Sequence, residues 1–489
     1  MERCSGVLMP ISALPSRFGV GDFGNTSFEF VNHIKKGGFK LWQILPLNPL
    51  GYGHSPYQPF SSFALDELYM DLDGLFEEKL IAKPASFNEY AQKVFYEDVA
   101  KYKHELLLEA FSNDQLNLEE RLNKFVEANE WVKPWSLFMT FKRKNDMRSW
   151  NEWPMEEQLL IKEENPSLSE EEKYKRTYEI WVQMKLYEQW SKLKKYANDN
   201  GIRIIGDVPF YCGFDSCDVW ANQDCFLLDE ETKQPTFIAG VPPDYFSPDG
   251  QRWGNPIYNW DLFEKTNFKF LINRLKGNGV IYDIIRLDHF RAFDTFWKIP
   301  SSCPTAIEGE GIEPPGYKFF ETFNKEAGDI EIIAEDLGLL RPEVLVLRDY
   351  FSFPGMNVIE FNFEQTELEK KYDKTKENMV AYIGTHDNDP FIGFFDKLES
   401  WKKGQWENAL NELNLPGESI KDKMINYCLS LNAKYAIIAV QDILGLGSEA
   451  RLNKPAIIDD VNWTWRLVSY KELENNLEKL RLANELYHR

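Results

Sequence analysis

The chain has 489 residues, a formal net charge of -22 and 43% hydrophobic residues. This length allows one very large domain or several ordinary ones with a sizeable core. The acidic balance argues against nucleic acid and anionic membrane surfaces as partners, because both are bound through basic patches.

The N-terminal residues and the spacing of the cysteines indicate the cellular compartment in which the protein is expected. The first residues lack the basic start and apolar run of a signal peptide, and the sequence has no apolar run of membrane-spanning length. Cys212, Cys217 and Cys225 lack the paired spacing of a zinc site. We therefore expect free thiols in a cytoplasmic protein.

Eight short apolar runs that end in polar residues predict strands. They are near-continuous rather than alternating, as expected of parallel strands that are covered on both faces. The runs are residues 5–12, 40–46, 202–209, 281–288, 330–336, 357–363, 379–387 and 434–442. Helical patterns lie between most of them, for example at 23–37 and 341–351. We expect a (β/α)8 barrel of the TIM type, with a doubly wound open sheet as the alternative.

The domain organisation follows from two gaps that are too long for simple connections. We expect one catalytic barrel domain over 1–489, with a mostly helical subdomain inserted at 54–200. Within that insertion, Ser169 and Glu172 have the spacing of a helix capping box. Residues 210–280 are rich in Pro, Gly and aromatic residues and predict an inserted active-site loop subdomain.

Acidic side chains stand at the ends of five predicted strands, where a barrel of this type carries its chemistry. They are Asp207, Asp288, Glu335, Asp387 and Asp442. A single Asp after a strand commonly caps the next helix. Five acids together, with Arg286, His289 and His386 beside them, favour a functional site. No HExxH, EF-hand or GxSxG motif occurs, so we expect no metal, no cofactor and no serine nucleophile.

Two of these acids are predicted to differ in charge state. Side chains alternate along a strand, so Arg286 and Asp288 share one face, and the guanidinium should lower the pKa of Asp288 and keep it ionised. Glu335 follows an apolar run, where a carboxyl stays protonated and can act as a general acid. Such a pair is typical of glycoside chemistry, and a separation of about 5–5.5 Å would indicate a retaining mechanism. Asp387 and His386 would then bind sugar hydroxyls.

Three motifs carry a family resemblance. "RLDHFRAF", "IIAEDLG" and "GTHDNDP", in this order, resemble the acidic motifs of amylomaltases, also called 4-α-glucanotransferases or disproportionating enzymes. Further segments such as "QDILGLGSEARLNKP" extend the resemblance over nearly the whole chain. It implies a barrel without a C-terminal β-sandwich. It also implies Asp288 as nucleophile, Glu335 as general acid/base and Asp387 as transition-state stabiliser.

The resemblance also implies substrate contacts. "PPDYFSPDGQRW" resembles a loop over the cleft, and "GYGHSPY" resembles a second cleft segment. The implied contacts are Asp244, Gln251, Trp253, Tyr52, Ser55, Tyr57, Arg286 and His386. Single positions depart from the expected pattern, among them His54, Ala292 and Pro390.

The expected function is that of a retaining 4-α-glucanotransferase. It would move α-1,4-glucan segments between malto-oligosaccharides, or between starch or glycogen chains, as a monomer or homodimer. An α-amylase-like hydrolase with the same acids is one alternative. A non-catalytic glucan-binding barrel is another, although the presence of all three acids argues against it.

Overall fold

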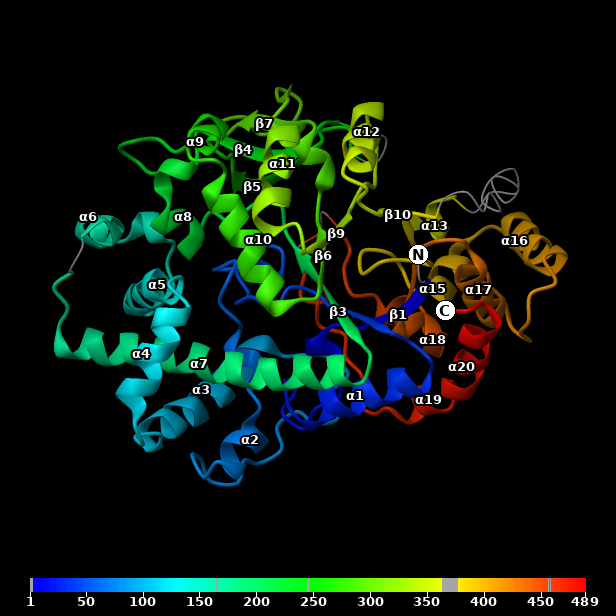
Figure 1. Cartoon of the computed structure of the whole chain (residues 1–489), viewed down its shortest axis with the longest axis horizontal. Coiled ribbons are helices and arrows are strands. Elements are labelled where there is room, and N and C mark those ends of the chain that lie inside the picture. Colours follow the sequence, from blue (N-terminus) through cyan, green and yellow to red (C-terminus); the bar gives the residue numbers. More distant parts are fainter. Residues whose placement is uncertain (1–2, 164–165, 244–246, 363–376, 456, 458) are drawn as a thin grey trace.

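The structure is a computed structural model that describes residues 3–163, 166–243, 247–362, 377–455, 457 and 459–489. Helices surround a central group of strands, and the two ends of the chain lie near each other (Figure 1). The C-terminal Arg489 donates a hydrogen bond to the carbonyl of Cys4 at 3.4 Å.

Eight parallel strands form a (β/α)8 barrel. They are β1 (Cys4–Leu8), β2 (Leu41–Gln43), β3 (Arg203–Val208), β6 (Ile284–Leu287), β9 (Glu331–Ala334), β10 (Gly355–Val358), β11 (Met379–Tyr382) and β12 (Tyr435–Ala439). They pair in the order β10-β11-β12-β1-β2-β3-β6-β9. Between the two outer strands of this order, the Ala334 N–H donates to the Pro354 carbonyl at 2.8 Å.

Each predicted apolar run overlaps one of these strands, which confirms the barrel. The run at 357–363 differs most, because β10 ends at Val358 and α13 (Ile359–Asn362) follows directly. A short apolar run alone does not distinguish a buried strand from a buried helix. Here the run covers both.

Side chains of the barrel strands divide into two apolar layers because successive residues face opposite sides of a strand. The inner layer fills the barrel with residues of all eight strands, among them Leu41, Ile205, Ile284 and Ile333. The alternate residues, such as Ile285, pack in the larger layer against the helices. Strands buried on both faces explain the continuous apolar runs of the sequence.

Helices cover the barrel between and after its strands. They are α1 (Asn25–Lys36), α10 (Lys269–Ile281), α11 (Gly316–Ala327), α12 (Pro342–Tyr350), α15 (Phe391–Lys397), α16 (Ser400–Glu412), α17 (Ile420–Ser430), α18 (Val440–Leu444), α19 (Lys471–Glu474) and α20 (Leu477–Leu486). α1 and α12 confirm the predicted helices at 23–37 and 341–351. The described residues after β12 form helices rather than a β-sandwich.

Residues 54–200 are mostly helical and lie to one side of the barrel (Figure 1). Their helices are α2 (Leu72–Glu77), α3 (Tyr96–Asn113), α4 (Leu118–Ala128), α5 (Val132–Lys144), α6 (Met155–Leu159) and α7 (Glu170–Asp199). α7 begins with the predicted capping box, in which Ser169 and Glu172 exchange side-chain and backbone hydrogen bonds.

A second, antiparallel sheet stands beside the barrel and was not predicted. It consists of β5 (Gln251–Pro256), β4 (Phe237–Val241), β7 (Phe296–Pro300) and β8 (Glu310–Ile312), in this order. Two of its strands come from beyond residue 280, so the segment 210–280 is completed by residues after β6. Two short helices, α8 (Cys217–Ala221) and α9 (Trp260–Lys265), belong to the same part of the chain.

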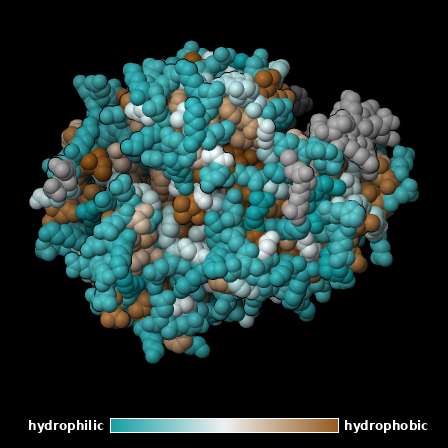
Figure 2. Space-filling model, viewed as in Figure 1, coloured by the Kyte–Doolittle hydropathy of each residue, from teal (hydrophilic) through white to brown (hydrophobic). Residues whose placement is uncertain are grey.

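The surface shown in Figure 2 is largely hydrophilic, with hydrophobic residues in scattered groups. Among the described helices, none is both long and apolar enough to cross a membrane. All six cysteines are free thiols, as predicted.

Candidate active site

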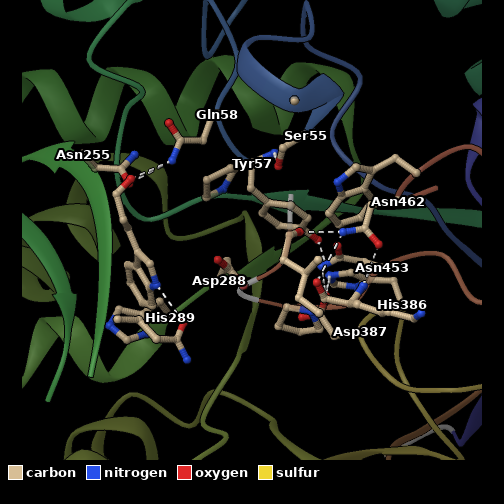
Figure 3. A pocket seen from close by; sticks show the side chains of 18 of the residues that line it. Ser55, Tyr57, Gln58, Asn255, Asp288, His289, His386, Asp387, Asn453 and Asn462 are labelled. Atoms are coloured by element: carbon tan, nitrogen blue, oxygen red, sulfur yellow. Dashed lines mark hydrogen bonds and ion pairs between the residues drawn. The ribbon is translucent and has the colours of Figure 1, made fainter. Parts of the chain in front are cut away.

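A cleft of about 410 Å³ opens where the chain leaves several barrel strands. Its lining comes from five parts of the sequence: residues 53–58, 209–211, 251–255, 288–289 and 386–387. A further wall comes from Asn453, Lys454, Pro455, Ile457, Asp459, Asn462 and Trp463. Figure 3 shows Asp288 between a group around His289 and Asn255 and a group around Tyr57, His386 and Asp387.

Asp288 directly follows β6, and Arg286 precedes it on the same face of the strand. Arg286 is buried, and its Nη1 atom lies 2.9 Å from Asp288 Oδ1. The same nitrogen lies 2.8 and 2.7 Å from the two carboxylate oxygens of Asp207 on the neighbouring β3. One guanidinium therefore joins the two strand ends, which confirms the predicted pairing of Arg286 with Asp288.

The predicted direction of the Asp288 pKa is wrong. Burial raises this pKa to about 6, against the opposing effect of Arg286, and the nearby negative charge of Asp207 raises it further. Because Arg286 is shared with Asp207, it does not compensate fully for the loss of hydration. Asp288 is still mainly ionised at neutral pH, as a nucleophile must be.

Glu335 directly follows β9. Its Oε2 accepts from the His289 N–H at 2.8 Å and its Oε1 accepts from the Leu337 N–H at 3.0 Å. Burial and the charge of Asp288 raise its pKa to about 8, although the two N–H groups oppose the shift. A proton held here at neutral pH agrees with the predicted general acid.

His289 links Glu335 to the aromatic side of the cleft. Its backbone is left-handed (φ 50°, ψ 46°), a conformation that L residues seldom adopt, and its N–H points at Glu335. Its ring packs edge-on against Trp253, with the centroids 4.8 Å apart. Burial lowers the pKa of His289 to about 3, so this imidazole is neutral at the pH at which Asp288 and Glu335 titrate.

His386, Tyr57 and Asp207 form a hydrogen-bonded chain on the other side of Asp288. The Tyr57 hydroxyl donates to Asp207 Oδ2 at 2.8 Å and lies 2.8 Å from His386 Nε2. The hydroxyl has a single proton, which Asp207 accepts, so His386 Nε2 must be the donor to Tyr57. His386 Nε2 therefore carries a hydrogen that is directed at the Tyr57 hydroxyl.

Asp387 is reached by groups from two segments. His386 Nε2 lies 3.4 Å from its Oδ1 atom, and the Asn453 Nδ2–H donates to the same oxygen at 2.7 Å. Asn453 belongs to the segment that follows β12. Trp463, at the end of this segment, has a left-handed backbone (φ 67°) and packs beside the rings of Tyr57 and His386.

The other predicted contacts have mixed outcomes. Ser55, Tyr57, Gln251 and Trp253 all line the cleft. The backbone of Tyr52 lies in a 3-10 helix that ends at His54. Asp244 lies outside the described residues.

The prediction that five acids form one site at the strand ends is only partly correct. Asp442 lies inside α18, is 2% exposed and accepts from the Phe391 N–H at 2.7 Å, where it caps α15. Asp207 is fully buried and holds Arg286 and Tyr57 rather than facing the cleft. Strand-end position alone does not separate these roles.

Two departures from the expected family pattern have local explanations. His54 adopts a positive φ and stacks on Tyr96, with the ring centroids 4.9 Å apart. Ala292 lies in a 3-10 helix, a backbone that alanine adopts without strain, and its methyl group is fully buried.

Several contributors to the site were not singled out from the sequence. They are the His289 N–H, Tyr211, Arg451, Asn453 and Trp463. A signal for Arg451 and Asn453 was the segment "QDILGLGSEARLNKP", which the resemblance had already included, whereas Trp463 lies beyond it. Over the part of the chain that the structure describes, no three His, Cys, Asp or Glu side chains are grouped so as to hold a metal ion.

Comparison with known proteins identifies the family. The family model described as 4-alpha-glucanotransferase matches residues 9–471. The chain belongs to the 4-alpha-glucanotransferase family. It is 40% identical to a 4-alpha-glucanotransferase of Clostridium butyricum, with 98% of each chain covered. The corresponding protein of Aquifex aeolicus is 39% identical over 98% of both chains.

A solved structure of the family has the same architecture over the full length. It is the amylomaltase of Streptococcus agalactiae in complex with acarbose, 35% identical, with a TM-score of 0.92 and complete coverage of both chains. A Corynebacterium glutamicum amylomaltase shares the fold at 18% identity, with a TM-score of 0.76.

Proposed function

We propose that this chain transfers α-1,4-glucan segments from a donor chain to the 4-hydroxyl of another glucan or of glucose. The observation that carries the proposal is the pairing of two carboxyl groups at neighbouring strand ends. Asp288 has a pKa of about 6 and Glu335 a pKa of about 8. Near neutral pH one is a nucleophile and the other an acid. Family membership gives the same reaction.

The first step breaks the donor glycosidic bond. The Asp288 carboxylate attacks the anomeric carbon, and the bond to the glycosidic oxygen breaks as Glu335 delivers its proton to that oxygen. The products are a glycosyl ester on Asp288 and a released glucan that carries a new hydroxyl. Because Glu335 is held by the N–H of His289, the leaving sugar lies on the His289 and Trp253 side of Asp288.

The second step reverses these roles. Glu335, now ionised, accepts the proton of the acceptor 4-hydroxyl, and the resulting oxygen nucleophile attacks the anomeric carbon and displaces Asp288. Two inversions retain the α configuration. Asp387 and His386 bind hydroxyls of the reacting sugar, and Asp387 stabilises the positive charge that develops on its ring.

Transfer rather than hydrolysis requires that water be kept from the glycosyl ester. The rings of Trp253, His289 and Tyr211 form a wall on the acceptor side, with Trp253 edge-on to both other rings. A sugar bound against this wall displaces water there. Malto-oligosaccharides, and chains of starch or glycogen, are the substrates that we propose, in a cytoplasmic protein without metal or cofactor.

Incubation with maltotriose tests the proposal. We expect glucose together with oligosaccharides longer than maltotriose. Shorter sugars alone, with a steady rise in reducing ends, would indicate the α-amylase-like hydrolase. Binding without any change in chain length would indicate a non-catalytic barrel.

We also propose that 54–200 and 210–280 act as inserted subdomains of a single catalytic domain, and that the chain works as a monomer or homodimer. The first proposal rests on the helices of 54–200 and on the sheet that carries Gln251 and Trp253. Size-exclusion chromatography with light scattering would give the oligomeric state.

A further inference from the structure

The three acids of the cleft are held by three different kinds of group. Asp288 is held by the cation of Arg286, and Glu335 by two backbone N–H groups. Asp387 is held by the neutral side-chain amide of Asn453, at 2.7 Å. We propose that Asn453 is a positioning residue that orients Asp387 without neutralising it. The inference rests on the proposed role of Asp387.

The contact between these two residues has a defined polarity. A carboxylate offers only acceptors, so the Nδ2–H end of the amide must face Asp387 while the amide oxygen points away. The Asn453 hydrogen bond fixes Oδ1 of Asp387, with His386 Nε2 farther away at 3.4 Å, and the Asp387 side chain stays 43% exposed. The arrangement leaves a carboxylate that is aimed but free to accept hydroxyls of a sugar.

Arg451 supports the backbones of both partners. Its Nε donates to the Asn453 carbonyl at 2.7 Å, and its Nη2 donates to the Asp387 carbonyl at 2.5 Å. The charge of Arg451 also lies 3.8 Å from Asp389, which itself pairs with Lys397. The nearby cation therefore ties two backbones together and faces another acid.

The rest of the segment is fixed by Asn462. Its Oδ1 accepts from the Lys454 N–H at 3.0 Å, and its Nδ2 donates to the Ile457 carbonyl at 2.8 Å. Asn453 is therefore presented by a braced loop rather than by a free chain. Such support is what keeps a catalytic side chain within the narrow range of productive geometry.

The neutrality of the donor matters because the transition state is positively charged. A carboxylate stabilises an oxocarbenium-like ring in proportion to the charge that it retains. A cation at hydrogen-bond distance would orient Asp387 equally well but would cancel much of its field. An amide supplies orientation alone.

The test compares Asn453→Ala, Asn453→Lys and Asn453→Asp with the full-length enzyme. Turnover is measured with maltotriose and with α-maltotriosyl fluoride, whose fluoride leaves without needing a proton from Glu335. We expect Asn453→Ala to lower kcat about 10²-fold on both donors, as a misplaced group does, while KM changes little. An equal loss of kcat on both donors would show that Asn453 acts through Asp387 and not through proton transfer from Glu335.

The charged variants test neutrality. Asn453→Lys keeps a donor but adds a positive charge, so kcat should fall at least as far as in Asn453→Ala. Asn453→Asp removes the amide donor and places a second carboxylate beside Asp387, so kcat should fall at least as far as in Asn453→Ala. Binding of acarbose, whose amine is protonated, should weaken more than binding of maltotriose in Asn453→Ala.

The controls separate the possible failures. Asn414→Ala, at an exposed asparagine whose side-chain amide donates to the Glu412 carbonyl, should keep the turnover of wild type. A kcat within twofold of wild type for folded Asn453→Ala, or near-normal turnover by Asn453→Lys, overturns the inference. If Asn453→Ala fails to fold, the kcat values of Asn453→Asp and Asn453→Lys decide: near-normal turnover by either one overturns the inference. Turnover by Asp387→Asn would instead refute the proposed role of Asp387.

Discussion

Arg286 lies 2.9 Å from Asp288 and yet leaves the pKa of Asp288 above its ordinary value. The guanidinium is also bound at 2.7 and 2.8 Å by Asp207, which is fully buried. Two carboxylates thus compete for one cation in a site with little water. The result is that Asp288, the proposed nucleophile, has a pKa just below neutral, while Glu335, the proposed acid, has a pKa just above it.

The pH dependence of the reaction follows from this pair. Below about pH 6, Asp288 takes up a proton and loses its nucleophilicity. Above about pH 8, Glu335 loses the proton that the leaving oxygen needs. We expect a bell-shaped profile of kcat/KM for maltotriose with its maximum near neutrality, and limbs that belong to the coupled pair.

The choice of glycosyl donor distinguishes the acid limb from the alkaline limb of the pH profile. With α-maltotriosyl fluoride the first step needs no proton, so the alkaline limb should weaken while the acid limb remains. Glu335→Gln should glycosylate itself from the fluoride but turn over maltotriose very slowly. An unchanged alkaline limb with the fluoride would contradict the assignment of Glu335 as the acid.

Asp207→Asn tests the buried ion pair. The change leaves Arg286 with one charged partner in place of two and removes the carboxylate that accepts from Tyr57. We expect a loss of about 3 kcal/mol in the free energy of unfolding, because removing one partner of a buried ion pair is strongly destabilising. Urea denaturation measures it.

The matched control for this change is Asp199→Asn, which breaks an exposed pair with Lys195 on α7. Exposed pairs contribute on the order of 0.5 kcal/mol or less. Equal losses of unfolding free energy in the two variants would show that the Asp207–Arg286 pair stabilises the fold no more than an exposed pair does. Turnover of Asp207→Asn should fall as well, since Arg286 and Tyr57 both lose their anchor.

Trp253→Ala tests the shield against water. Trp253 packs against His289 on the acceptor side of the cleft, and removing its ring opens that side. We expect the share of glycosyl groups transferred to water to rise several-fold relative to transfer to sugars. Chromatography of the maltotriose products measures the ratio. Trp401→Ala, at an exposed ring on α16, is the control and should leave the ratio unchanged.

Asp442→Asn tests whether Asp442 caps α15 rather than taking part in catalysis. Burial raises the pKa of Asp442 to about 7, so the folded chain binds this proton more tightly than the unfolded chain. Wild-type stability should therefore decrease as pH rises from about 4 to 7. Asparagine keeps an acceptor for the Phe391 N–H and carries no charge.

We accordingly expect Asp442→Asn to match wild type near pH 4 in urea denaturation and to be more stable above pH 7. Its turnover should stay within a few-fold of wild type. A loss of turnover as large as that expected when the proposed nucleophile is removed by Asp288→Asn would indicate a catalytic role for Asp442. It would contradict the role of Asp442 as a helix cap.

The sequence by itself determined the barrel, the position of each of its strands to within a few residues and the three acids. The physical reason is local: strands buried on both faces must be continuously apolar, and the first polar residue after them marks the rim. It also determined that Arg286 shares a face with Asp288, because alternation along a strand is fixed by backbone geometry.

Only the tertiary structure decided how these groups behave. The pKa of Asp288 depends on Asp207, which is 81 residues away in the sequence but adjacent across β3 and β6. The separate tasks of Asp207 and Asp442 depend on burial, and the donor to Asp387 comes from Asn453 after the last strand. Charge state and orientation arise from neighbours in space, and a one-dimensional pattern does not contain those neighbours.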